Sequence, residues 1–91
     1  MTFREESIDD FITLFEERKE KIRGFEGCEH LELWRDSKNP EVFFTYSKWR
    51  SESALDHYRF SDFFKDTWSK MKKLFADKPR AWSVIQKYVL E

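Results

Sequence analysis

The first strong pattern along the chain is helical and covers residues 7–24. Its apolar positions lie at helical spacing and are Ile8, Phe11, Ile12, Phe15 and Ile22. One apolar stripe with charged residues between its members predicts an amphipathic helix. Ser7 suits the N-cap, with Asp10 three residues on as in a capping box, and Gly24 is expected to end the helix in the left-handed conformation.

A hairpin follows, because the pattern then alternates with a period of two. In "CEHLELWR", residues 28–35, the positions predicted to share one face are Cys28, His30, Glu32 and Trp34. After the turn "DSKNPE", the segment "VFFTYSKW", residues 42–49, is rich in β-branched and aromatic residues and predicts the second arm. Both of its faces are apolar, with Val42, Phe44 and Tyr46 on one and Phe43 and Trp49 on the other. A single layer of helices can cover only one of these faces.

The second half of the chain predicts a broken helix and a last strand. "SESALDHY" begins with serines suited to capping, and a longer helix is expected after a break near Phe60, with Ser61 as its cap. Its apolar positions are Phe64, Trp68, Met71 and Phe75. Pro79 prevents further helix, and "RAWSVIQKYVL", residues 80–90, alternates again and predicts a closing strand. A short first strand is expected in "MTFRE", residues 1–5.

The order of these elements predicts a fold. βαββαβ is the ferredoxin-like arrangement of the α+β class, an antiparallel sheet with its helices on one face. The uncovered apolar face of the hairpin predicts that two sheets pack across a two-fold axis, which makes the protein a homodimer and its fold a dimeric α/β barrel. Residues 1–91 are expected to form a single domain.

Composition narrows the function classes. Aromatic residues make up 19% of the chain, a large apolar supply for 91 residues, while 17 basic residues nearly balance 18 acidic ones. The balance gives no basic field for nucleic acid, and the chain has no membrane span and no secretory signal, so the expected location is cytoplasmic. The one cysteine, Cys28, has no metal-ligand partners at zinc spacing, and no other metal or cofactor motif occurs. We therefore predict no metal and no cofactor.

The run "FEGCEHLELWRDSKNPEVFFTYSKWRSESALDHYRFSDFF", followed by "KPRAWSV", resembles the antibiotic biosynthesis monooxygenase (ABM) superfamily. The matching pieces include "GC" before the strand, a hairpin that ends in Trp49, the "SESAL" helix start and "HYRFSDFF". The resemblance implies a homodimer whose sheets form a shared barrel, with a small-molecule pocket in each subunit between its helices and its sheet. Relatives usually have more residues before the first strand, so either the native chain starts upstream of Met1 or the sheet tolerates a short central strand.

Within this resemblance, the segment after the hairpin supplies the candidate site. Tyr58, and His57 if it faces the pocket, are the predicted catalytic residues, because an imidazole can take a proton from a phenol or hydroquinol near neutral pH. The alternative for His57 is a place at the rim of the pocket or in solvent. The predicted substrate-binding residues are Tyr46, Trp49, Phe64 and Trp68. The alternative for these rings is simple core packing, while a planar aromatic ligand would need such flat apolar walls.

Three functions stay open on the sequence alone. The first is cofactor-independent monooxygenation of a small aromatic or quinol, and the second is a ligand-binding or regulatory dimer without catalysis. The third is haem degradation, which ranks last. The helix positions that hold a tryptophan and a haem-binding histidine in haem-degrading members of the superfamily are occupied here by Tyr58 and Trp68, and an indole cannot ligate iron.

Overall fold

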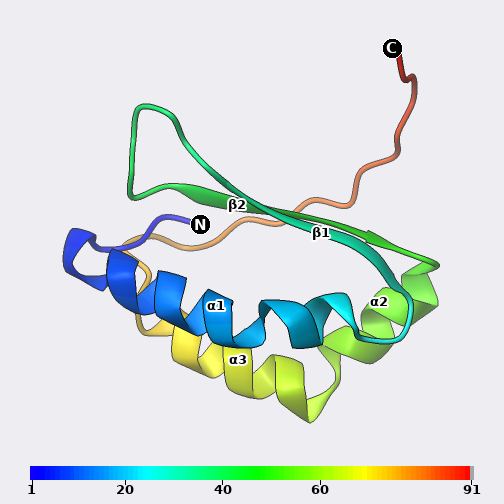
Figure 1. Ribbon diagram of the computed structural model, residues 1–91, viewed down its shortest axis with the longest axis horizontal. Coiled ribbons are helices and arrows are strands. Elements are labelled where there is room, and N and C mark those ends of the chain that lie inside the picture. The colour runs from blue at the N-terminus through cyan, green and yellow to red at the C-terminus, as the bar shows by residue number, and fades with distance from the viewer. Residues whose placement is uncertain (91) are drawn as a thin grey trace.

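The computed structural model describes residues 1–90 and has an α+β architecture (Figure 1). In chain order its elements are the 3-10 turn η1 (Glu5–Ser7), α1 (Ile8–Arg23), β1 (Cys28–Arg35), β2 (Phe43–Trp49), α2 (Glu52–Arg59) and α3 (Asp62–Lys72). The predicted first helix, hairpin and broken second helix are all present, and the predicted fold class is confirmed.

The hairpin and the N-terminal segment make up the sheet layer. β1 and β2 pair antiparallel. Residues 1–3 run beside the start of β2, where the backbone N of Phe43 donates a hydrogen bond to the carbonyl of Met1 at 2.8 Å. The predicted first strand is reduced to two isolated bridges, which join Thr2 to Val42 and Phe3 to Phe75. The N-terminal segment therefore lies between β2 and the segment after α3, the central position that a ferredoxin-like sheet gives its first strand.

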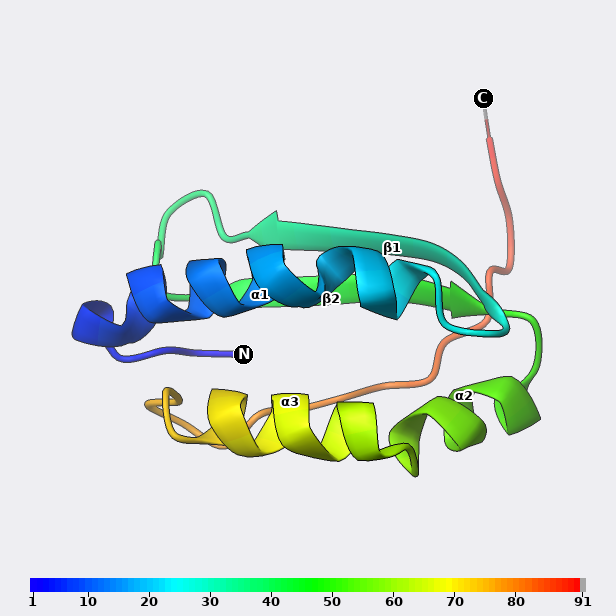
Figure 2. The same cartoon turned by 60° about the horizontal axis from the view of Figure 1, so that its bottom comes forward.

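The three helices lie in one layer on one side of the strands (Figures 1 and 2). The core between the layers is built from Phe3, Phe11 and Phe43, which are 1%, 0% and 3% exposed. Phe3 and Phe11 stack with ring centroids 4.1 Å apart, and Phe43 meets the Phe11 ring at 5.1 Å. Around them pack Met1, Ile8, Ile12, Phe15, Leu33, Met71, Leu74 and Phe75. Burying large rings in this way is how so short a chain gains a sufficient core.

The two faces of the hairpin differ as predicted. Phe43 and Trp49 contact the helix layer through Phe11 and Tyr58, so the odd-numbered positions of β2 face the helices. The opposite face, here called the outer face, carries Trp34, Phe44 and Tyr46. Trp34 is 51% and Phe44 46% exposed, so the helices leave this apolar face uncovered.

Cys28 departs from the predicted alternation. The register shifts between Cys28 and His30, so that Cys28 lies opposite Trp49 and His30 opposite Lys48. This β-bulge inserts one extra residue and moves Cys28 to the side of Trp49, away from the outer face of His30. The thiol is buried, with the whole residue 8% exposed.

The ends of α1 also differ from the predicted ones. Ser7 is the N-cap residue, but its side chain makes no capping bond, because η1 leads the chain into the helix as a tighter turn. Gly24 ends the helix with φ −82°, so the predicted left-handed exit at this residue is wrong. The positive φ belongs to Gly27 instead, at +88°.

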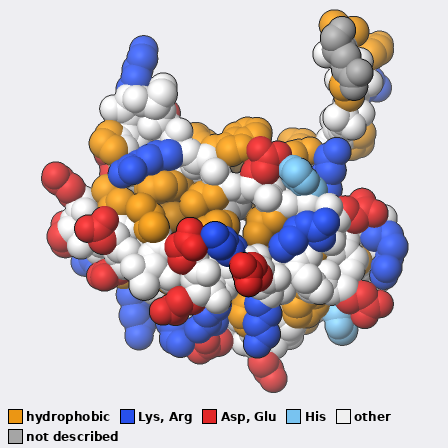
Figure 3. All heavy atoms as spheres, viewed as in Figure 1, with side chains coloured by type: hydrophobic (Ala, Val, Ile, Leu, Met, Phe, Trp, Pro, Cys, Tyr) orange, Lys and Arg blue, Asp and Glu red, His pale blue; other side chains and the backbone are white. Residues whose placement is uncertain are grey.

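The predicted closing strand is not formed in the single chain. Residues 79–90 have no regular secondary structure; the segment first runs past the strands, and its end projects from the body of the molecule, as Figures 1 and 3 show. Their exposed fractions include 72% for Trp82, 76% for Val84, 90% for Ile85 and 95% for Leu90. An alternating apolar strand gains its stability from a neighbouring strand and a covered face, and this segment has neither within one chain.

Candidate functional site

A continuous series of aromatic rings runs along the helix layer from α2 to the end of α3. Its members are Phe25, Trp49, Tyr58, Phe64, Trp68 and Phe75. Tyr58 lies at the centre, stacked on Trp49 with centroids 4.9 Å apart and in edge contact with Phe25 and Phe64 at 5.0 and 5.1 Å. The structure thus brings together four of the predicted site residues in one cluster.

Two serine caps position the helices that carry these rings. The Ser51 hydroxyl accepts a hydrogen bond from the backbone N of Ala54 at 3.1 Å, and the Ser61 hydroxyl accepts one from Phe64 N at 3.1 Å. Each cap satisfies an N–H group that the first helical turn leaves unpaired. Gly27 lets α2 approach the start of β1, since an added Cβ there would lie 2.5 Å from Ala54 Cβ.

Tyr58 is the most buried polar-tipped ring of the cluster, with 8% of its surface exposed. Burial, with a smaller contribution from Cys28, raises its pKa to about 12. The phenol is protonated at neutral pH, as a tyrosine with an ordinary pKa also is, and it can donate a hydrogen bond. A donor in a poorly hydrated site stabilises an oxyanion more strongly than it would in water.

His57 takes the neighbouring position on α2 and points elsewhere. The residue is exposed, and its ring centroid lies 5.9 Å from that of Phe25. It therefore sits at the outer end of the aromatic cluster, which agrees with a rim position. Its role as a base stays a prediction.

Tyr46 is the predicted site residue that the structure separates from the others. It lies on the outer face, stacked on Trp34 with centroids 5.6 Å apart and in edge contact with His30 at 5.9 Å. The sheet stands between this ring and the Trp49–Tyr58 stack, since successive residues of β2 point to opposite faces.

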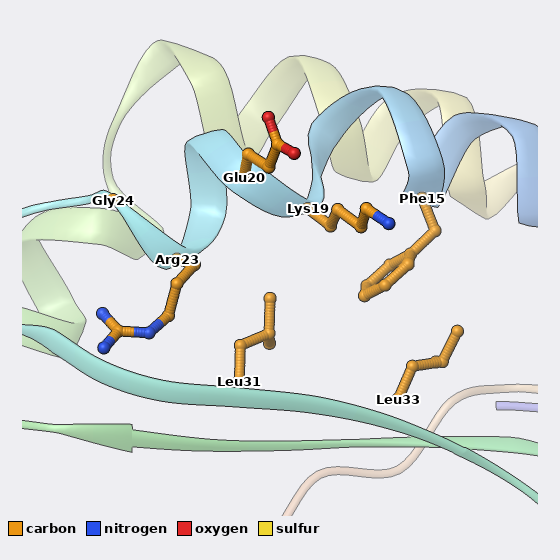
Figure 4. A pocket seen from close by; sticks show the side chains of 7 residues that line it. All are labelled: Phe15, Lys19, Glu20, Arg23, Gly24, Leu31 and Leu33. Atoms are coloured by element: carbon orange, nitrogen blue, oxygen red, sulfur yellow. The ribbon is translucent and has the colours of Figure 1, made fainter.

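An open cavity of about 430 Å³ lies between α1 and β1 (Figure 4). Phe15 on α1 and Leu31 and Leu33 on β1 supply its apolar walls. Its other lining residues are Lys19, Glu20, Arg23 and Gly24. This volume falls within the range of small-molecule sites, about 300–1,000 Å³.

The cavity continues the same face of the sheet that carries Trp49. Leu33 and Leu31 lie directly opposite Thr45 and Ser47 of β2, so these four side chains share the helix-facing side. Thr45 and Ser47 remain exposed there, and the Ser47 hydroxyl accepts a hydrogen bond from Trp49 Nε1 at 3.0 Å. Thr45 and Ser47 thus lie on the same side of β2 as Trp49.

Sequence reasoning missed the cavity walls. Phe15 is part of the helical stripe, and Leu31 and Leu33 follow the strand alternation, so all three have the spacing of ordinary core residues. Their spacing does not distinguish a residue that lines a cavity from one that is buried in the core. The exposure of Thr45 and Ser47 on the helix-facing side depends on the distance between layers, which one sequence does not specify.

Comparison with known proteins identifies the family to which this chain belongs. The sequence profile of the antibiotic biosynthesis monooxygenase family matches residues 1–69. The chain belongs to this family. No curated protein matches the ABM chain in sequence.

Solved structures support the same fold. A crystal structure of an antibiotic biosynthesis monooxygenase is 25% identical, with a TM-score of 0.78 over 85% of this chain and 81% of that one. A conserved protein of Methanosarcina mazei Go1 is 23% identical, with a TM-score of 0.80 over 85% of this chain and 76% of that one. A Mycobacterium tuberculosis protein at 19% identity has a TM-score of 0.79 over 97% and 91% of the two chains. These similarities confirm the ferredoxin-like arrangement of the ABM fold.

Proteins of the ABM fold are generally dimers that bind small molecules. Within residues 1–90, no helix is long and apolar enough to cross a membrane.

Proposed function

We propose that the protein is an ABM-type monooxygenase that oxidises a small aromatic or quinol substrate without a cofactor. The observation that carries the proposal is the aromatic cluster centred on the buried Tyr58, with an open cavity on the same helix-facing side of the sheet. Flat rings and leucine side chains suit a planar aromatic ligand, and the few polar hydrogens nearby would orient its oxygen atoms.

In this reaction the substrate itself supplies the electrons. A deprotonated substrate passes one electron to O₂, and the two radicals combine through a new C–O bond to give a hydroperoxide. For a substrate with a CH₂ group, such as an anthrone, loss of water then leaves a carbonyl where that group stood. One oxygen atom enters the product, the other leaves as water, and O₂ accepts the four electrons that the carbon loses.

The chain would assist at two points. Tyr58, a buried phenol that is protonated at neutral pH, would donate a hydrogen bond to the substrate oxyanion and so favour the deprotonated form. His57 would accept the substrate proton from the rim of the cluster, a step for which one placed base is worth about 10²- to 10⁴-fold.

Oxygen consumption with anthrones and hydroquinones tests this proposal. Replacing Tyr58 by Phe and His57 by Ala, separately, should lower kcat/KM at least tenfold in one or both variants. Tyr88→Phe is the matched control, because this hydroxyl lies on the projecting C-terminal segment, where Tyr88 is 85% exposed. If both variants consume oxygen at the wild-type rate, the assignment of the site is wrong.

A ligand-binding dimer without catalysis is the second candidate. The exposed position of His57 favours it, because among the predicted site residues this was the one expected to act as a base. A thermal-shift screen against quinols, anthrones, flavonoids, flavins and haemin separates the two candidates. Stabilisation by quinols or anthrones without oxygen uptake would establish binding alone. A rise in the unfolding temperature with haemin alone would favour haem degradation instead.

We also propose that the protein is a homodimer, in which the outer faces of two copies pack together. Trp34 and Phe44 are about half exposed there, and the C-terminal segment exposes further large apolar side chains. A monomer rarely leaves so many large apolar side chains exposed together on one face of a sheet. A second copy offers the same surfaces in return, which is what a two-fold interface requires.

Light scattering or sedimentation tests the dimer. The wild type is expected to be a dimer at micromolar concentration, and Phe44→Lys should shift it to monomer. Phe60→Lys is the matched control, because Phe60 is 75% exposed at the junction of α2 and α3, away from the outer face. A wild-type mass of 11.3 kDa at micromolar concentration would refute the proposal.

A further inference from the structure

The edge of β1 that faces away from β2, here called the free edge, is open. β2 has β1 on one side and the N-terminal segment beside its start on the other, whereas no strand of the described residues pairs with the free edge of β1. The cavity lies along this edge, because all of its lining residues come from α1, the residue that follows α1, and β1. Phe15 points into it from α1, and Leu31 and Leu33 point toward it from β1 (Figure 4). An unpaired strand thus borders an uncovered apolar surface.

The peptide groups of β1 show which atoms the free edge presents. The backbone N of Asp36 donates a hydrogen bond to the carbonyl of Val42 at 2.9 Å, so the even-numbered positions of this strand direct their peptide groups toward β2. Along an antiparallel strand this direction alternates, so Leu31, Leu33 and Arg35 direct theirs toward the free edge. A row of such groups is a surface on which a strand of another chain can pair.

Residues 80–90 have the pattern of a strand that is covered on both faces. The even-numbered face carries Trp82, Val84, Tyr88 and Leu90, and the odd-numbered face carries Ala81, Ile85 and Val89. The six large side chains of this set are exposed in the single chain, from 59% for Val89 to 95% for Leu90. A strand with two apolar faces belongs between two layers, which one copy of the chain does not provide for it.

The segment does not reach the free edge of β1 within its own chain. The backbone N of Ala76 donates a hydrogen bond to the carbonyl of Thr2 at 2.8 Å, and Phe75 forms a bridge with Phe3. The segment therefore leaves from the opposite side of the sheet, with the N-terminal segment and β2 between it and β1. Its end projects away from the helices, on the side where the outer face is proposed to meet a second copy (Figure 1). A second copy is thus the chain that can bring this strand to the free edge.

Charge and area both fit such an exchange. Residues 80–90 carry two basic residues and no acidic one, whereas β1 carries two glutamates and one arginine. Trp82 and Tyr88 are 72% and 85% exposed, and a buried aromatic ring removes about 150–250 Å² from water. The four such rings of two copies would contribute roughly half of the about 1,600 Å² that a stable interface buries.

We infer that residues 80–90 of each copy add as a strand to the free edge of β1 in the other copy, and that this strand closes the cavity beside α1. Its even-numbered face, with the large rings of Trp82 and Tyr88, would join the aromatic side chains of the outer face. Its odd-numbered face would lie on the side of Leu31 and Leu33. The inference rests on the proposed homodimer, and it adds that the cavity of each copy is complete only with a strand from its partner.

Disulfide formation between two differently tagged chains, co-expressed so that mixed dimers form, tests the exchange. Both chains carry Cys28→Ala, one also carries Leu31→Cys, and the other carries Ile85→Cys. Neighbouring strands lie about 4.8 Å apart, and a disulfide needs Cα atoms about 4.4–6.8 Å apart. Ser83→Cys and Lys87→Cys, on the same face of the segment as Ile85→Cys, cover the adjacent registers. At least one of the three positions should give tenfold more mixed disulfide than the control.

Thr45→Cys in place of Leu31→Cys is the matched control. Thr45 lies directly opposite Leu33 and faces the same side of the sheet, but it belongs to β2, one strand farther from the free edge. Two strand spacings of about 10 Å are too long for a disulfide. Equal yields with Thr45→Cys and Leu31→Cys, or no mixed disulfide at any of the three positions, would overturn the inference. A disulfide closed within one chain that carries both Leu31→Cys and Ile85→Cys would also overturn it.

Light scattering of the same variants separates this inference from the proposals on which it rests. A dimer without the mixed disulfide would overturn the exchange and leave the homodimer standing, whereas a monomer would overturn both. A mixed disulfide without oxygen uptake would support the exchange and count against the monooxygenase proposal.

Discussion

Replacing Tyr58 in two different ways should separate its packing from its chemistry. Tyr58→Ala removes a ring that is 8% exposed and contacts Trp49, Phe25 and Phe64. Loss of a buried aromatic side chain costs about 3–5 kcal/mol in the free energy of unfolding, and each aromatic pair accounts for about 0.5–1.5 kcal/mol of such a loss. Tyr58→Phe keeps all three ring contacts and should change the free energy of unfolding by less than about 0.5 kcal/mol.

The size of the alanine effect matters because the domain is small. At roughly 0.05–0.15 kcal/mol per residue, 91 residues give a total of about 5–14 kcal/mol, so Tyr58→Ala should remove a large part of the stability. Urea unfolding followed by tryptophan fluorescence measures both variants, at one fixed protein concentration because association shifts the midpoint. If Tyr58→Ala costs less than about 1 kcal/mol, the ring is not the centre of the cluster and the reasoning fails.

Three further predictions concern stability. Gly27→Ala should destabilise the protein by more than about 2 kcal/mol in urea unfolding, because the residue has φ +88° and its new Cβ would lie 2.5 Å from Ala54 Cβ. An unchanged unfolding midpoint would contradict the close approach of α2 to the start of β1. Thr67→Val should lower the free energy of unfolding by about 1–2 kcal/mol in the same assay. The buried hydroxyl accepts a hydrogen bond from Arg18 Nη1 at 2.7 Å and donates one to the backbone carbonyl of Phe63. An unchanged stability would show that these two hydrogen bonds are not formed in solution. Because the pKa of Tyr58 is raised from 10.0 to about 12, the unfolded chain ionises first, and about 1–2 kcal/mol of stability should be lost between these pH values. The Tyr58→Phe variant should lack this part of the loss, and equal pH profiles would contradict the raised pKa.

Local signals in the sequence were enough for much of the fold. The bounds of β1, the break before Ser61 and the caps at Ser51 and Ser61 follow from alternation and from short-range hydrogen bonds, and the structure shows all of them. The same alternation also separates Tyr46 from Trp49, because an odd spacing along a strand puts two residues on opposite faces.

The remaining features depend on tertiary contacts. The left-handed conformation lies at Gly27 and not at Gly24, because the chain must turn where α2 approaches β1. The alternating pattern of residues 80–90 favours a β-strand, but within a single chain this segment pairs with no neighbouring strand and stays irregular. The walls of the cavity, among them Phe15, have the same periodicity as the core, so their separation from the facing layer is visible only in three dimensions.

The β-bulge at the start of β1 has a consequence for the redox behaviour of the protein. With strict alternation, Cys28 would lie on the outer face beside His30, and the only thiol of the chain would lie where two copies are proposed to meet. The extra residue turns this thiol inward, where it is 8% exposed. An oxidant therefore finds no pair of accessible sulfur atoms to join across the outer faces. Association of two copies would be governed by concentration and temperature, and a reducing agent should leave it unchanged.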